Sequence, residues 1–198
     1  MRAQNRLLDI FCSLAGLTLL APVLGLIAVL IKLTMRGPAF FCQVRPGLKG
    51  ELFKMYKFRT MLLDDTLPEE KRITRLGKFL RKTSLDELPE LYNVLRGNMS
   101  LVGPRPLLPE YLSYYSARQM RRHDVKPGIT GWAQVNGRNS ITWEQKFEHD
   151  VWYVEHADLW LDLKIIFLTL FAVVRREGVN QSESVTMTKF RGSQKDVA

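Results

Sequence analysis

The chain has 198 residues, of which 46% are hydrophobic, and it carries a formal net charge of +9. This length suits one domain with a packed core. The charge predicts an anionic partner, but it leaves nucleic acid, anionic lipid and a phosphorylated substrate all open. The two cysteines, Cys12 and Cys42, are too few for a disulfide framework and lack metal-ligand spacing, which favours a reducing location.

The first element in chain order is an apolar segment without charge over residues 10–31. Its length of about 22 residues is sufficient to cross the hydrocarbon core of a bilayer as a helix. Arg2 and Arg6 precede it, as they would in a secretory leader, but the run is long for one and no small-residue cleavage site follows. The segment is therefore interpreted as a membrane anchor.

Pro22 lies near the middle of this apolar segment. A proline inside a helix removes one backbone hydrogen bond and clashes with the preceding turn, so a kink is expected there. Lys32 and Arg36 follow the segment, as Arg6 precedes it, and basic residues at both ends favour anionic headgroups. A kinked spanning helix and a re-entrant helix that leaves by the face it entered both fit this pattern.

Residues 39–60 are rich in aromatic and β-favouring side chains, split by Pro46, Gly47 and Gly50. This pattern predicts a β-hairpin. Because side chains alternate along a strand, Lys57 and Arg59 should point to the same face.

The remaining segments are assigned by their periodicity and composition. Residues 62–72 are polar and carry a proline, which predicts a surface connection, and helical character resumes after them. Residues 107–123 have the spacing of an amphipathic helix. Glycines among amide and basic side chains predict a ligand-approaching loop over 126–139. Residues 159–174 fit an interfacial helix, and the residues from 181 onward fit a polar tail.

Two adjacent carboxylates, Asp86 and Glu87, open the next helical pattern. Ser84 and Glu87 match a capping box, and acidic residues in a first helical turn offset the helix dipole, so a structural role explains both. The same position keeps a carboxylate ionised, as a nucleophile or a magnesium ligand must be. The residues alone leave both interpretations open.

Several cations are candidates for binding a diphosphate, because guanidinium groups match phosphate oxygens and a lysine adds a mobile charge. Arg105 is the sharpest candidate, since the prolines of SLVGPRPLLPE hold it in a stiff loop. Each cation taken alone also fits a solvated surface charge. A P-loop and a dinucleotide-binding glycine fingerprint are absent from the sequence. The candidates are Lys57, Arg59, Arg81, Arg105 and Arg138.

Three segments carry a family resemblance: KMYKFRTM, GKFLRKTSLDELPELYNVLRGNMSLVGPRPLLPEY and HDVKPGITGWAQVNGRNSITWEQKFEHDVWY. Together they resemble the small monotopic phosphoglycosyl transferases of the bacterial sugar transferase superfamily over nearly the whole chain. The SLDELP and GPRP motifs are highly specific. Length and the C-terminal half most resemble the enzyme that initiates bacterial N-linked protein glycosylation.

The resemblance implies an α+β fold that is mostly helical. It implies a re-entrant membrane helix over residues 1–36, kinked at Pro22, and a catalytic domain over 37–198. That domain would combine a small β-hairpin, amphipathic interfacial helices and a polar C-terminal tail on the cytoplasmic face of the bacterial inner membrane. The family break is a Ser-Pro pair, whereas this chain has Ala21 before Pro22 and lacks the hydroxyl that could bond a freed backbone group.

The resemblance also implies a reaction, the first membrane step of glycoconjugate biosynthesis. A sugar 1-phosphate moves from a UDP-sugar, with an N-acetylated amino sugar expected, to undecaprenyl phosphate, and UMP is released. Asp86 would be the nucleophile of a covalent intermediate, and Glu87 would hold Mg²⁺. The substrate-binding residues would be Lys57, Arg59, Arg81 and Arg105 at the phosphates and Gln134, Asn136 and Arg138 at the nucleotide.

Inner-membrane lipids are a further expected partner, and nucleic acid is not. One rival interpretation is a membrane-anchored basic protein that binds nucleic acid or lipid without catalysis; another is a phosphohydrolase that uses the same two carboxylates. The sequence fixes neither the sugar, the glycoconjugate pathway nor the oligomeric state.

Overall fold

The computed structural model describes residues 5–137, 141–175, 190 and 192. These residues form a mostly helical α+β structure with two small two-stranded sheets, as expected. The α-helices are α1 (Arg6–Leu19), α2 (Ala21–Met35), α3 (Glu69–Arg72), α4 (Arg75–Lys82), α5 (Glu90–Arg96), α6 (Ala117–Met120), α7 (Trp132–Val135), α8 (Trp143–His156) and α9 (Leu159–Arg175). The 3-10 turns are η1 (Leu48–Gly50), η2 (Leu85–Glu87), η3 (Pro109–Tyr114) and η4 (Arg121–His123). The strands are β1 (Phe40–Pro46), β2 (Leu52–Phe58), β3 (Ser100–Val102) and β4 (Gly128–Thr130).

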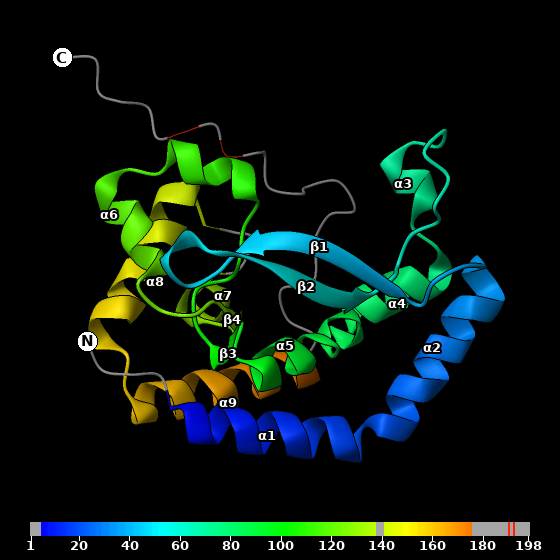
Figure 1. Ribbon diagram of the computed structural model, residues 1–198, viewed down its shortest axis with the longest axis horizontal. Coiled ribbons are helices and arrows are strands. Elements are labelled where there is room, and N and C mark those ends of the chain that lie inside the picture. The colour runs from blue at the N-terminus through cyan, green and yellow to red at the C-terminus, as the bar shows by residue number, and fades with distance from the viewer. Residues whose placement is uncertain (1–4, 138–140, 176–189, 191, 193–198) are drawn as a thin grey trace.

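The predicted bend in the apolar segment is confirmed, because α1 and α2 meet at 61° (Figure 1). Pro22 occupies the first turn of α2, where its missing N–H breaks no helical hydrogen bond. Within the described residues no single helix has the length and apolarity to cross a bilayer, whereas α1 and α2 together reach both. Whether the pair re-enters a membrane stays a prediction.

Helix α1 is fixed to the rest of the fold by two charged side chains near its start. Arg6 donates to the carbonyl oxygens of Val94 and Leu95, at the C-terminal end of α5. The carboxylate of Asp9, which is 3% exposed, accepts from the Ser100 hydroxyl at 2.9 Å and the Leu101 amide at 2.8 Å. The helix is thus tied to α5 and β3 by hydrogen bonds as well as by packing.

The predicted hairpin is confirmed, with β1 and β2 antiparallel and Phe41 opposite Lys57. Its turn uses left-handed backbone at Lys49 (φ 54°) and Gly50 (φ 79°). Met55 is 4% exposed, so the face that it shares with Lys57 turns toward the body of the protein.

The connection after the hairpin is mostly exposed, as predicted, and contains the short helix α3. Helix α4 then packs closely under the end of β2. A side-chain Cβ at Gly77 would lie 1.9 Å from the carbonyl oxygen of Thr60, so only glycine fits there. This contact brings the start of α4 to the residues that follow the hairpin.

The prediction of one amphipathic helix over 107–123 is wrong. The segment is divided into η3, α6 and η4. Pro109 starts the first piece, and Ser116 starts a new helix through a capping box with Gln119. Apolar spacing continued across these breaks, so periodicity did not show them.

The expected loop over 126–139 contains β4 and α7. Strand β4 lies parallel to β3, and Gly128 allows the two backbones to approach: a Cβ there would lie 2.1 Å from the amide nitrogen of Gly103. Of the predicted polar tail, only Phe190 and Gly192 are among the described residues, and Phe190 is buried against Tyr111 and Phe147.

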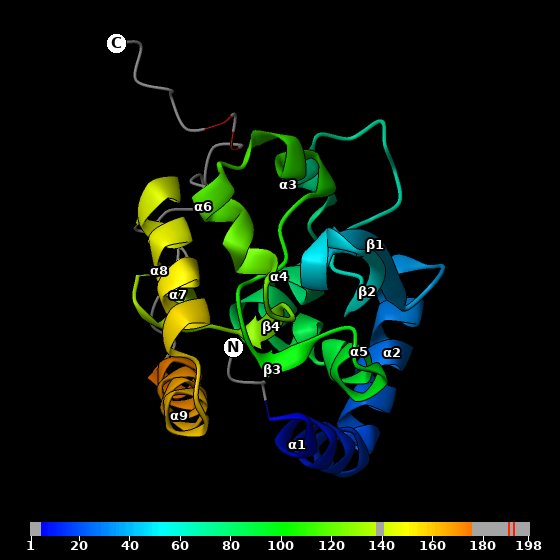
Figure 2. The same ribbon diagram turned by 60° about the vertical axis from the view of Figure 1, so that its left-hand side comes forward.

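Helices α1 and α9 both pack against β3 and lie on the same side of the molecule (Figures 1 and 2). Both expose large apolar side chains, as does α2. The most exposed are Leu7, Phe11, Leu19, Leu33, Trp160 and Phe167. Helix α9 is therefore confirmed as a helix, while its place at a membrane interface stays a prediction.

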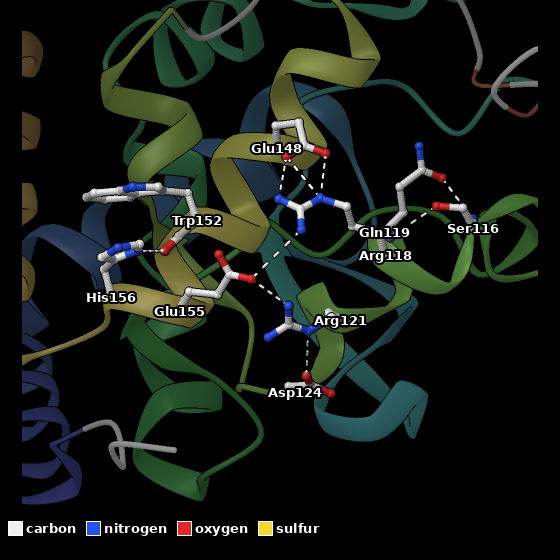
Figure 3. A network of polar contacts seen from close by, with 9 residues as sticks. All are labelled: Ser116, Arg118, Gln119, Arg121, Asp124, Glu148, Trp152, Glu155 and His156. Carbon is white, nitrogen blue, oxygen red and sulfur yellow. Dashed lines mark hydrogen bonds and ion pairs between the residues drawn. The ribbon is translucent and has the colours of Figure 1, made fainter.

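A network of exposed ion pairs joins α6 and η4 to α8 (Figure 3). Arg118 contacts Glu148 at 2.7 Å, and Arg121 contacts Glu155. The side chains of Arg118 and Glu148 are 53% and 56% exposed. This exposed network (Arg118, Arg121, Glu148 and Glu155) links α6 and η4 to α8, close to the turn of the hairpin, which η4 contacts.

Candidate active site

A pocket of about 560 Å³ is bounded by the hairpin, the residues after it, α4, η2 and Arg105. It has a charged part and an apolar part. The charged lining residues are Arg45, Lys57, Arg59, Arg72, Arg81, Asp86, Glu87 and Arg105. The apolar lining residues are Phe41, Phe58, Met61, Leu62 and Leu63. Most of the residues predicted from the sequence are thus brought together here.

Glu87 is the most heavily bonded carboxylate of the pocket. Its Oε1 accepts from Lys57 Nζ at 2.8 Å and from Arg105 Nη2, and its Oε2 accepts from Arg105 Nη1 at 3.3 Å. Burial raises the pKa of Glu87, but the nearby charges of Arg105 and Lys57 outweigh it and bring the pKa well below its ordinary value. Glu87 is therefore ionised at neutral pH.

Asp86 differs from its neighbour, because within the described part of the chain its carboxylate makes no hydrogen bond or ion pair. Burial and the adjacent charge of Glu87 raise the pKa of Asp86, while Lys57, Arg105 and Arg81 oppose that shift. A raised pKa makes an ionised carboxylate a better nucleophile, and nothing has to be displaced from it.

The predicted capping box at Ser84 and Glu87 is wrong. Ser84 has left-handed backbone (φ 56°, ψ 16°) and its side chain caps nothing. Glu87 turns instead toward Lys57 and Arg105. Left-handed backbone is strained for a residue with a side chain, and such strain recurs at functional sites.

A third carboxylate of the site, Glu90, was not predicted from the sequence. It is 2% exposed, and its Oε1 lies 3.0 Å from Lys57 Nζ. Burial and the charge of Glu87 raise the pKa of Glu90 to about 7. Its spacing of three residues from Glu87 was the available signal, because such residues share one helical face.

Arg59, which directly follows β2, and Arg81, near the end of α4, also line the pocket. Arg59 is 3% exposed and donates from Nη2 to the carbonyl oxygen of Arg36 at 2.7 Å. Arg81 is exposed and donates from Nε to the Thr60 hydroxyl at 2.9 Å.

The three residues expected at the nucleotide are not part of this pocket's described lining. Gln134 donates to the Ile129 carbonyl at 2.8 Å, and Asn136 donates to the Trp132 carbonyl at 2.9 Å. Arg138 lies outside the described residues. Their role in binding a nucleotide stays a prediction.

Arg105 is supported from behind by a buried ion pair that the sequence analysis also missed. Arg122 donates from Nη2 to the Arg105 carbonyl at 2.8 Å and to Asp150 at 2.7 Å. The side chains of Arg122 and Asp150 are only 1% and 3% exposed. These contacts fix the backbone from which the Arg105 side chain reaches Glu87.

The described residues contain no group of three or more His, Cys, Asp or Glu that could hold a metal ion by itself. Mg²⁺ does not need one, because it commonly binds one or two carboxylates together with substrate phosphates. Asp86 and Glu87 supply two adjacent carboxylates, so the donor set fits Mg²⁺.

The pocket unites an unpaired carboxylate with guanidinium and ammonium groups, which is the equipment of an enzyme that acts on phosphate groups. The particular kind of enzyme follows from comparison with known proteins. The sequence model of the bacterial sugar transferase family matches residues 1–176, and the chain belongs to this family.

A Bacillus subtilis protein named uncharacterized sugar transferase EpsL is 50% identical over 194 residues, which is 96% of each chain. The UDP-glucose:undecaprenyl-phosphate glucose-1-phosphate transferases of Klebsiella pneumoniae and Escherichia coli are 46% and 44% identical. Those matches cover 84% of this chain but only 39% and 40% of the two relatives. The expected kinship with the enzyme of N-linked glycosylation stays a prediction.

Proposed function

We propose that the protein transfers a sugar 1-phosphate from a UDP-sugar to undecaprenyl phosphate and releases UMP. The unpaired carboxylate of Asp86, beside a Glu87 held by Arg105 and Lys57, carries this proposal. Relatives at 44–46% identity are named for this reaction with glucose, which supports the same reaction class here.

In the first step an Asp86 oxygen attacks the β-phosphorus of the UDP-sugar. A bond forms between the carboxylate oxygen and phosphorus, and the bond from that phosphorus to the oxygen bridging the two phosphates breaks. UMP leaves with the electron pair, and the sugar phosphate remains on Asp86. Covalent catalysis of this kind divides one difficult displacement into two easier ones.

In the second step a phosphate oxygen of the lipid attacks the same phosphorus, and the bond from phosphorus to Asp86 breaks. The carboxylate leaves with its electron pair, and the lipid carries the sugar through a diphosphate. Arg105, Lys57 and Arg81 would hold phosphate oxygens in both steps, because the charge transferred is spread over those oxygens.

Asp86 and Glu87 would hold Mg²⁺. The bound ion would neutralise part of the negative charge of the diphosphate. Lys57 and Arg105 both form ion pairs with Glu87. When substrate phosphates enter, these two cations can contact them while Glu87 keeps its position.

The proposed location is the cytoplasmic face of the bacterial inner membrane, with the pair α1–α2 re-entrant at its 61° bend. Cysteines introduced at Gln4 and Arg36, with Cys12 and Cys42 replaced by serine, should both be labelled only after the membrane is permeabilised. Labelling of residue 4 from the periplasm in intact cells would contradict the re-entrant arrangement and indicate a spanning one.

The covalent step is tested with a UDP-sugar labelled in its β-phosphate and no lipid acceptor. Wild type should release about one UMP per enzyme and carry the label on Asp86, as located by mass spectrometry. Asp86→Asn keeps the shape of the residue and should form no adduct. Turnover without an adduct, an adduct on Glu87, or free sugar phosphate as the product would contradict the proposal.

The sugar is tested with a panel that includes UDP-glucose, UDP-galactose and UDP-linked N-acetylated amino sugars. The amino sugar was expected from the family resemblance, whereas the two relatives above are named for glucose. UMP release with and without undecaprenyl phosphate, measured for each donor, assigns the substrate.

A further inference from the structure

Arg59 lines the pocket but has no role in the two reaction steps described above. It is 3% exposed, and its Nε and Nη1 groups have no hydrogen-bond partner among the described residues. Buried donors are nearly always paired, because an unpaired one loses its hydration without compensation. Desolvation lowers the pKa of Arg59, as expected for a guanidinium without a nearby carboxylate.

The one hydrogen bond of Arg59 locates it within the fold. Its Nη2 donates to the carbonyl of Arg36, the residue that ends α2. The side chain therefore stands where the apolar pair α1–α2 joins the catalytic domain. Lys57, by contrast, is held at Glu87 and Glu90, at the carboxylate side of the same pocket.

Lys57 is the second-last residue of β2, and Arg59 directly follows the strand, where its amide donates to the Ala39 carbonyl and the alternation of side chains continues. Their Cα atoms are therefore about 7 Å apart along the strand. That spacing allows a second phosphate to contact Arg59 while the first is held by Lys57 and Arg105. In the second reaction step the lipid phosphate has to lie beside the phosphorus bound to Asp86, and Arg59 lies within reach of such a position.

Three apolar residues follow Arg59 closely in the sequence and in the pocket lining. They are Met61, Leu62 and Leu63, and Leu63 is 60% exposed. The position of a Cβ on Gly37 would be 3.5 Å from both Arg59 Nη1 and Leu63 Cδ1, so Leu63 lies next to the unpaired guanidinium. An anion carrying an apolar chain matches both parts of this wall.

We infer that Arg59 binds the phosphate of the lipid acceptor, and that Met61, Leu62 and Leu63 contact the first part of its polyprenyl chain. This assignment rests on the proposed function and divides the pocket cations between two substrates. Lys57, Arg81 and Arg105 serve the donor diphosphate, and Arg59 serves the acceptor.

The test separates the two half-reactions in the full-length protein. Arg59→Gln should raise the KM for undecaprenyl phosphate about tenfold or more, because a charge-assisted contact is lost. The KM for the UDP-sugar and the UMP released without acceptor should stay within about twofold of wild type, because donor contacts remain. Arg59→Lys keeps the charge without the planar fork and should give a smaller rise in the same KM.

Arg75→Gln is the matched control, since it removes one exposed positive charge from α4 outside the pocket lining and should change neither KM. A second arm measures binding to vesicles containing phosphatidylglycerol, which should be equal for wild type and Arg59→Gln. If Arg59→Gln is unfolded by its melting profile, Arg59→Lys is used for all comparisons.

Three outcomes would overturn the inference: an unchanged KM for the acceptor, a matching loss of UMP release without acceptor, or a loss of vesicle binding. The second would assign Arg59 to the donor, and the third would assign it to bulk anionic lipid. Failure of wild type itself to release UMP without acceptor would instead count against the proposed covalent function.

Discussion

The pocket and the exposed network contain the same chemical pairs in opposite surroundings. Arg118 and Glu148 of the network are more than half exposed. The side chain of Glu87 in the pocket is 18% exposed and forms ion pairs with both Arg105 and Lys57. Behind the pocket, Arg122 and Asp150 are almost fully buried.

The contribution of an arginine–carboxylate contact to stability therefore depends on how far the pair is buried. Water screens an exposed pair, and such pairs contribute about 0–1 kcal/mol to stability. A buried charge that loses its partner keeps its desolvation penalty, so its removal is far more damaging. Substitutions in the pocket, behind it and in the network should therefore give graded effects.

The largest effect is expected behind the pocket, at Arg122. Arg122→Met leaves Asp150 buried without its partner, and the free energy of unfolding should fall by about 3–5 kcal/mol. Denaturant or thermal unfolding of the purified protein measures this. The double variant Arg122→Met/Asp150→Leu should recover part of the loss, because the unpaired charge is gone; no recovery would mean that the pair is not the cause.

The next effect is on catalysis, at Arg105. Arg105→Lys keeps the charge but loses the two-nitrogen contact with Glu87, and kcat/KM should fall about 100-fold. Arg121→Lys makes the same exchange in the exposed network and should leave kcat/KM unchanged. Equal kinetics for the two variants would remove Arg105 from the phosphate site.

A pH effect of intermediate size is expected at His123. Its Nδ1 donates to the Gly47 carbonyl at 3.0 Å, and burial with the charge of Arg122 lowers its pKa from 6.5 to about 4. Because the unfolded chain binds a proton first, stability from His123 is present above pH 6.5 and is lost as pH falls toward 4.

The expected loss is about 1.4 kcal/mol for each pH unit below 6.5. Other groups titrate in the same range, so the measured quantity is the difference in unfolding free energy between wild type and His123→Gln at several pH values. This difference should shrink as pH falls from 7 to 4.5. A constant difference would show that His123 does not titrate as described.

The smallest effect is expected in the exposed network. Arg118→Ala should change the unfolding free energy by less than about 1 kcal/mol. A double-mutant cycle with Glu148→Ala measures the coupling itself, which should be a few tenths of a kcal/mol and decrease in high salt. A coupling of several kcal/mol would contradict the expectation that the exposed pair contributes less to stability than the buried one.

The features that could be predicted from the sequence depend on residues that lie close together in the chain. The hairpin was predicted because period-two alternation and the Pro46-Gly47 turn lie within one short segment. The same alternation predicted that Lys57 and Arg59 share one face, and both line the pocket. The kink at Pro22 followed from the chemistry of a single residue.

The features that it missed depend on residues far apart in the chain. Ser84 and Glu87 have the spacing of a helix cap, but Glu87 bonds instead to Lys57, 30 residues earlier, and to Arg105, 18 residues later. Arg122 and Asp150 are 28 residues apart and share no periodic pattern. Glu90 looked like an ordinary helical residue, because its burial against Lys57 arises only when the hairpin packs on α5.

The bonds that Arg6 and Asp9 make with α5 and β3 bear on how this protein can be produced. Removing the first two helices is the usual way to obtain a water-soluble fragment of a membrane-associated enzyme. Here that truncation would strip the donor from the carbonyls of Val94 and Leu95 and the acceptor from Ser100 and Leu101. Because α5 follows directly on the turn that carries Asp86, a shortened chain would lose the support of its own reaction centre, and detergent or nanodisc preparations should retain α1.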